Sequence, residues 1–88
     1  MANKRDLKKD INFVLGDIIE AVYIWEESNP EAKKDKGEKI IDEAIAAFDE
    51  LMVKVNDRKI EDPKKHFKSI REDLEKKANE LVDQVNTL

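Results

Sequence analysis

The stretch INFVLGDIIEAVYIW, residues 11–25, is the least polar part of a chain in which 43% of the residues are charged. Ten of its fifteen residues are large apolar or aromatic side chains, whereas a helix that faces one core needs only an apolar stripe. At about 100° per residue, one side of the helix collects Leu7, Ile11, Val14, Leu15, Ile18, Ile19, Val22 and Trp25. The stripe predicts a helix from Lys4 to Glu27 and leaves Phe13 and Ile24 on its back.

Two further amphipathic segments follow. The third piece of the chain repeats apolar side chains at spacings of three and four, namely Phe67, Ile70, Leu74, Ala78, Leu81, Val85 and Leu88. The second piece has an apolar sector of roughly 160°, wider than a stripe needs to be, which is made of Ile40, Ile41, Ala44, Ile45, Ala47, Phe48, Leu51, Met52 and Val55. Both segments are therefore predicted to be helices.

Capping residues indicate where the helices start. Asn29 precedes Pro30, and Asp62 precedes Pro63. An Asn or Asp at the N-cap accepts a hydrogen bond from the first turn, and proline is tolerated at the next position. Both prolines are thus expected to mark helix starts. Asn3 is expected to mark the third helix start. For the second helix two starts stay open, Pro30 or a restart near Glu38, because residues 33 and 37 would put a lysine and a glycine on the apolar face.

Short connections make sequential helices antiparallel neighbours. We therefore predict an all-α fold, a three-helix antiparallel (up-down-up) bundle, with dimerisation left open. The 88 residues fit one domain, residues 1–88. No alternating run or Asn-Gly hairpin supports strands. The chain lacks cysteine, and it has neither a signal-peptide pattern nor an apolar run of about 18 residues. We expect a soluble, cytoplasmic protein with no membrane association.

Catalytic and metal-binding patterns are not found. A di-iron bundle needs two Glu-x-x-His motifs, but the chain has one histidine, His66, which is expected to be an ordinary surface residue on the shoulder of the third helix. No glycine-rich phosphate loop is present. The carboxylates fall outside or at the edge of the apolar sectors, as on a solvated face. We predict a protein that is not an enzyme and that holds no cofactor and no metal.

Positive charge gathers at one end of the predicted bundle. Residues 1–10 carry +2 and residues 54–71 carry +4, while the whole chain carries −4. The end where these segments meet would bear +6, and the remainder −10. Candidate anion-binding residues are Lys4, Lys8, Lys64, Lys65, Lys68 and Arg71. We favour the alternative that nearby acids neutralise them, because net charge is negative, and nucleic acid is not an expected partner. Those acids are Asp6, Asp57, Glu61, Asp62 and Glu72.

The surplus apolar residues are the second functional lead. Phe13 and Ile24 lie within about 20° of each other on the back of the first helix, and Val53 adds an apolar side chain on the second. Isolated exposed apolar residues are normal in any protein. An equally weighted alternative is a docking surface for a protein partner or a second copy of the chain, which predicts a protein–protein interaction module and leaves a homodimer open.

The opening segment KRDLKKDIN, with the closing segment ELVDQVNTL, resembles a set of small uncharacterised all-helical bacterial proteins with a similar Lys-Arg-acid-Leu-Lys-Lys-x-Ile-Asn start. The N-terminal segment is the specific element of this resemblance. It implies a helical fold and a bacterial, intracellular origin. No activity and no functional residue follow from it.

Overall fold

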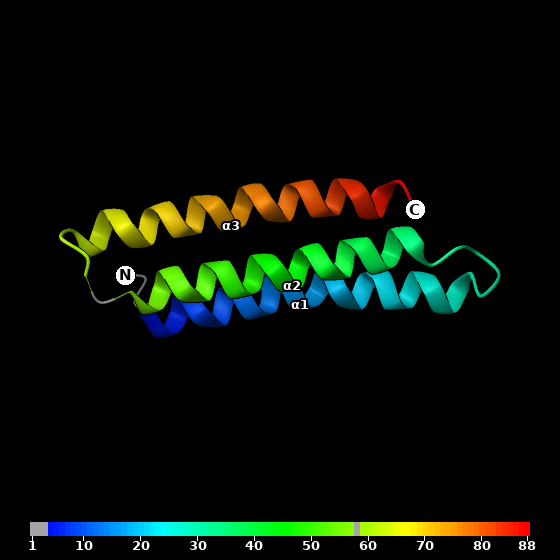
Figure 1. The fold of residues 1–88 in the computed structure, drawn as a ribbon, viewed down its shortest axis with the longest axis horizontal. Helices are drawn as coiled ribbons and strands as arrows, with labels where there is room; N and C mark the ends of the chain where they lie inside the picture. Colours follow the sequence, from blue (N-terminus) through cyan, green and yellow to red (C-terminus); the bar gives the residue numbers. More distant parts are fainter. Residues whose placement is uncertain (1–3, 58) are drawn as a thin grey trace.

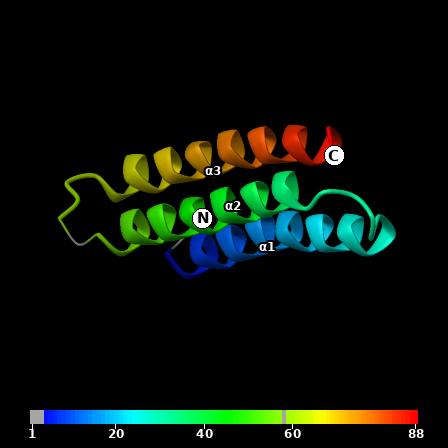
Figure 2. The same cartoon turned by 45° about the vertical axis from the view of Figure 1, so that its right-hand side comes forward.

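The computed structural model describes residues 4–57 and 59–88, and this part of the chain forms three helices and no strand. They are α1 (Lys4–Ser28), α2 (Asp35–Asn56) and α3 (Pro63–Asn86). The helices run alternately up, down and up in a rod of 51 × 19 × 17 Å, with short connections at opposite ends (Figure 1). Turning the rod by 45° keeps the three axes close to antiparallel (Figure 2). The predicted three-helix antiparallel bundle is confirmed.

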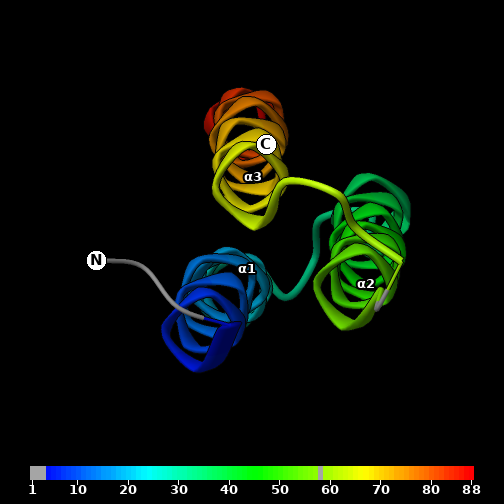
Figure 3. The same cartoon turned by 90° about the vertical axis from the view of Figure 1, so that its left-hand side faces the viewer.

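Viewed along the rod, the three helices stand at the corners of a triangle around one core (Figure 3). The predicted apolar faces line this core, and its buried members are Leu7, Ile11, Leu15, Ile18, Val22, Ile40, Ala44, Ala47, Leu51, Val55, Ile70, Leu74 and Leu81. Trp25 is only half-buried. Ile45, a member of the wide apolar sector of the second segment, lies outside the core, because 48% of this residue is exposed. In a triangle each helix buries only the sector that faces its two neighbours, and Ile45 lies about 100° around the helix from buried Ala44.

The first connection differs from both predicted starts of α2. The Asn29 side chain donates to the carbonyl of Trp25 at 2.9 Å, so it caps the end of α1 rather than the start of α2. Pro30 lies in a turn that is closed by the bond from the Ala32 N–H to the Asn29 carbonyl, 3.0 Å. The prediction that Pro30 starts a helix is therefore wrong, and α2 begins at Asp35, ahead of the predicted restart.

Gly37 explains how α2 continues upstream of residue 38. It is buried, and a Cβ at this position would lie 2.8 Å from Glu26 Oε1 and 3.0 Å from Val22 Cγ1. The absence of a side chain lets the first turn of α2 pass close to α1. A glycine that looked out of place on the apolar face of a helix is thus a point of close helix–helix contact.

The start of α3 is as predicted. Asp62 is the N-cap, and its side chain accepts a hydrogen bond from the backbone N–H of Lys65 at 3.3 Å. Pro63 occupies the first helical position, where its missing N–H costs nothing. The third predicted start, Asn3, lies outside the described residues.

His66 ties the start of α3 to the end of α2. Its Nε2 lies 2.6 Å from the carbonyl oxygen of Lys54, and the side chain is partly buried. Since a carbonyl oxygen only accepts, the imidazole donates. His66 lies on the shoulder of α3, as predicted, but it is more than an ordinary surface residue. The Lys54 carbonyl in the last turn of α2, which also accepts from the backbone N–H of Asp57 at 3.3 Å, lies next to its ring.

We expect His66→Ala to lower the free energy of unfolding by about 1 kcal/mol, because the Lys54 carbonyl then keeps only the longer bond from the Asp57 N–H and the link between α2 and α3 is lost. The midpoint of thermal unfolding should fall by about 4–8 °C. Circular dichroism during heating measures the shift. Lys65→Ala, at the exposed neighbouring position, is the control and should change the midpoint little. Equal midpoints for the two variants would contradict the stabilising role of His66.

Candidate functional site

The predicted basic residues do gather at one end of the bundle. The N-termini of α1 and α3 meet the C-terminus of α2 there, on the left of Figure 1. Lys64, Lys65 and Lys68 are exposed, and Lys4 and Lys8 are half-buried. The Arg71 guanidinium lies 3.1 Å from the Asp10 carboxylate, so this ion pair joins α3 to α1. Five of the six predicted residues are lysines near this end, and the sixth is already paired.

Two of the acids expected to neutralise this end bind backbone N–H groups. Asp57 Oδ1 accepts from the backbone N–H of Lys59 at 2.9 Å, and the Asp62 carboxylate caps α3. Within residues 4–57 and 59–88, Lys64, Lys65 and Lys68 form no ion pair. Two other acids, Asp10 and Asp73, form ion pairs with bases on a neighbouring helix. They were not among the acids that the sequence predicted to neutralise this end. Helical periodicity places them at the edge of a core stripe but does not show which neighbouring helix they face.

The basic end is therefore a set of exposed lysines and not a built anion pocket. The free N–H groups at a helix N-terminus attract anions, but at α3 the carboxylate of Asp62 already occupies that position. The guanidinium of Arg71 is paired with Asp10. An anion at this end would meet flexible ammonium groups without a fixed arrangement of donors.

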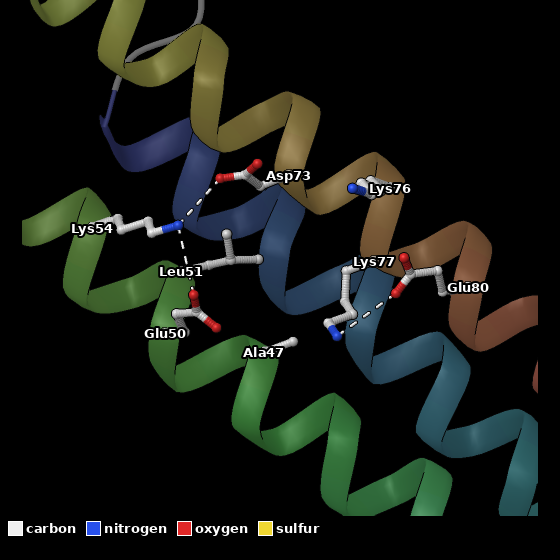
Figure 4. A pocket seen from close by; sticks show the side chains of 8 residues that line it. All are labelled: Ala47, Glu50, Leu51, Lys54, Asp73, Lys76, Lys77 and Glu80. Carbon is white, nitrogen blue, oxygen red and sulfur yellow. Dashed lines mark hydrogen bonds and ion pairs between the residues drawn. The ribbon is translucent and has the colours of Figure 1, made fainter.

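An open groove of about 280 Å³ runs between α2 and α3 (Figure 4). Ion pairs cross or border it: Lys54 Nζ lies 3.2 Å from Asp73 Oδ2 and 3.7 Å from Glu50 Oε1, and Lys77 lies 3.8 Å from Glu80. Its lining residues are Ala47, Glu50, Leu51, Lys54, Asp73, Lys76, Lys77 and Glu80. The three carboxylates and three ammonium groups of this lining give a net charge of zero. The groove is therefore a surface crossed by ion pairs between two helices, and its charges favour no particular ligand.

The described residues contain neither a candidate metal site nor a membrane-spanning helix. Residues 4–57 and 59–88 contain no group of three or more His, Cys, Asp or Glu side chains that could hold a metal ion. None of the helices in this part of the chain is long and apolar enough to cross a membrane.

The outer face of α1 carries the exposed apolar residues of the opening stretch. Phe13 is 57% exposed and Ile24 is 55% exposed, and Tyr23 beside them is also exposed. Gly16 lies between them on the same helix, and a Cβ built there would meet no atom within 4 Å. The α1 outer face consists of Phe13, Gly16, Tyr23 and Ile24.

Val53 does not belong to this face. It is 72% exposed, but it lies on the side of α2 that points away from the core. Because the helices stand in a triangle (Figure 3), the outward sides of α1 and α2 point in different directions. The structure thus brings two of the three predicted partner-binding residues onto one face and places the third on another.

Sequence reasoning missed exposed apolar residues on the other helices. Ile45 and Val82 are both large and exposed. Ile41, half-buried, lines a shallow hollow of about 350 Å³ between α1 and α2 together with Tyr23. These residues fall on the margins of wide apolar sectors, and periodicity alone cannot tell a core position from a margin.

No protein family model, no curated protein and no solved structure matches this chain. The fold alone defines its class, a small three-helix bundle. The resemblance of the opening segment to small bacterial helical proteins stays a prediction.

Proposed function

We propose that this protein is a non-catalytic interaction module that docks another protein chain through the α1 outer face. The observation that carries the proposal is the exposure of Phe13 and Ile24 on one helix face, with open space above Gly16 between them. When a partner covers large apolar side chains that contact water, the burial stabilises the complex by about 25 cal/mol per Å² of apolar surface. Aromatic side chains are enriched in the cores of protein–protein interfaces.

Gly16 supports the same conclusion. Glycine inside a helix costs about 1 kcal/mol relative to alanine, and no contact within the bundle requires it, because an added Cβ would meet nothing. Gly37 differs, since it is buried against α1. A partner that approaches α1 closely at residue 16 would explain why glycine occupies this exposed helical position.

The proposed role involves neither catalysis nor a cofactor, and we assign it to the cytoplasm because a cysteine-free chain suits a reducing compartment. The alternative is anion binding at the basic end, which the exposed, unpaired Lys64, Lys65 and Lys68 favour. The capped start of α3 and the Arg71–Asp10 pair count against it. Nucleic acid is the less suitable anion, since the net charge is −4.

Site-specific photo-crosslinking in cells tests the proposal. A benzophenone amino acid replaces Phe13, Ile24 or Val53, all of which are exposed. We expect covalent protein adducts, including any with a second copy of the chain, from positions 13 and 24 and not from position 53. Ile24→Asp in the chain labelled at position 13 should remove the adducts. An adduct pattern that does not differ among the three positions contradicts docking through α1.

A further inference from the structure

We infer that the partner on the α1 outer face is a second copy of this chain, docked antiparallel so that the two α1 helices pack against each other about a two-fold axis. This inference rests on the proposed function and names its partner. It draws on the order of charges along α1, the vacancy above Gly16, and the exposure of the apolar residues around it.

Charge changes sign along the outward side of α1. At about 100° per residue, an arc of about 100° on the outward side holds Arg5, Asp6, Lys9, Phe13, Gly16, Glu20, Tyr23, Ile24 and Glu27. Two bases and one acid come first, with a net charge of +1. Phe13 and Gly16 follow, and the two glutamates in the second half give −2. A second copy turned end for end presents its glutamates to the bases of the first. A parallel copy would place like charges together, which is unfavourable.

One register satisfies both the open space at Gly16 and the charge pair of Lys9 with Glu20. When the residue numbers on facing positions add up to 29, Phe13 of each copy lies over Gly16 of the other, where the structure leaves open space. In the same register Lys9 faces Glu20 of the second copy. A two-fold axis makes each of these contacts twice. Glycine permits the close backbone approach that this packing needs, because no Cβ stands in the way.

The charge of the whole molecule agrees with an antiparallel arrangement. Residues 4–10, 54–57 and 59–71, which together carry +5, lie at one end of the rod, and residues 11–53 and 72–88 carry −10. In the antiparallel dimer the basic end of each copy lies beside an acidic part of the other. Such complementarity speeds association and fixes orientation, and salt screens it.

The size of the face indicates the strength of the dimer. Stable interfaces bury about 800 Å² on each partner, which is roughly an eighth of the 6488 Å² surface of this chain. One face of α1, a helix of 25 residues and thus about 37 Å long, offers less than that. We therefore expect reversible association with a dissociation constant in the micromolar range.

Sedimentation equilibrium of the purified full chain measures the association, from about 5 to about 500 µM, a range that brackets the expected constant. The mass should rise from the 10.2 kDa of the monomer toward twice that value. Phe13→Asp should raise the dissociation constant more than about 10-fold, as loss of a central aromatic contact does. Val53→Asp, which adds the same charge at a more exposed position, should leave it within about 2-fold. Circular dichroism confirms that both variants remain helical.

Charge exchange tests the orientation. Lys9→Glu and Glu20→Lys each create two like-charge contacts across the axis, so each should weaken the dimer by about 3- to 10-fold at low salt. The double variant in one chain restores both contacts with reversed sign and should return the constant to near the original value. Additive weakening in the double variant would contradict the antiparallel register.

The two proposals fail in different ways. A strict monomer across the whole concentration range overturns the homodimer, and photo-adducts from position 13 to a different protein would then leave the proposed function standing. A monomer without any position-dependent adduct overturns both. A dimer that Phe13→Asp leaves intact also overturns the inference, because it shows that another face associates.

Discussion

Replacing Ile11 by alanine is expected to lower the free energy of unfolding by about 2–5 kcal/mol. Ile11 is fully buried in the core between the three helices, so the substitution removes its methyl and methylene groups and leaves a cavity that neighbouring side chains fill only in part. An 88-residue chain has about 4–13 kcal/mol of stability in total. The variant should therefore lose a large part of its stability. Urea denaturation followed by circular dichroism measures the change.

Ile24→Ala is the matched control, since it makes the same chemical change in the same helix at a position that is 55% exposed. Its effect should stay within about 0.5 kcal/mol, as is usual for surface positions. The contrast separates the two sets of apolar residues in the stretch from 11 to 25. Comparable losses from the two substitutions would show that Ile24 also contributes to the core.

The second large effect is expected at Gly37. Gly37→Leu places a branched side chain where even a Cβ would lie 3.0 Å from Val22 Cγ1, so the start of α2 must move away from α1. Overpacking of this kind costs about 1–3 kcal/mol. The midpoint of thermal unfolding should fall accordingly, by about 4–8 °C for each kcal/mol.

Gly16→Leu is the control for this experiment. An added Cβ there meets no atom within 4 Å, and leucine is a better helix former than glycine by up to about 1 kcal/mol. We expect a small gain in stability, measured at low micromolar concentration so that association does not contribute. The two glycine substitutions should thus have opposite signs. Destabilisation by Gly16→Leu under those conditions would show an intrachain contact at residue 16.

Helix number, order and core faces could be predicted from sequence because they depend on local information. Spacings of three and four put Ile11 and Val22 on one side of a helix, and Asp62 with Pro63 marked the start of α3. The exposure of Phe13 and Ile24 followed from the same wheel. These features depend on residues a few positions apart, so the spacing of residues in the sequence is enough to predict them.

Features that depend on which of several available hydrogen-bond partners a side chain takes, within one helix or between two helices, were not predictable. The same Asn-Pro pattern that marks a helix start could cap the end of the preceding helix, and Asn29 does so by bonding the Trp25 carbonyl. His66 became an interhelical donor only because the second connection brings it next to Lys54. Each of these outcomes depends on a partner that helical periodicity does not identify.

By itself, the sequence determined that this chain forms three amphipathic helices and that two apolar residues of its most hydrophobic stretch do not belong to the core. Only the tertiary structure decided that the space at Gly16 between Phe13 and Ile24 is open and that Val53 lies on another side of the bundle. The physical reason is that a helical wheel gives directions around one axis, whereas a surface is defined by how several axes are placed around a common core.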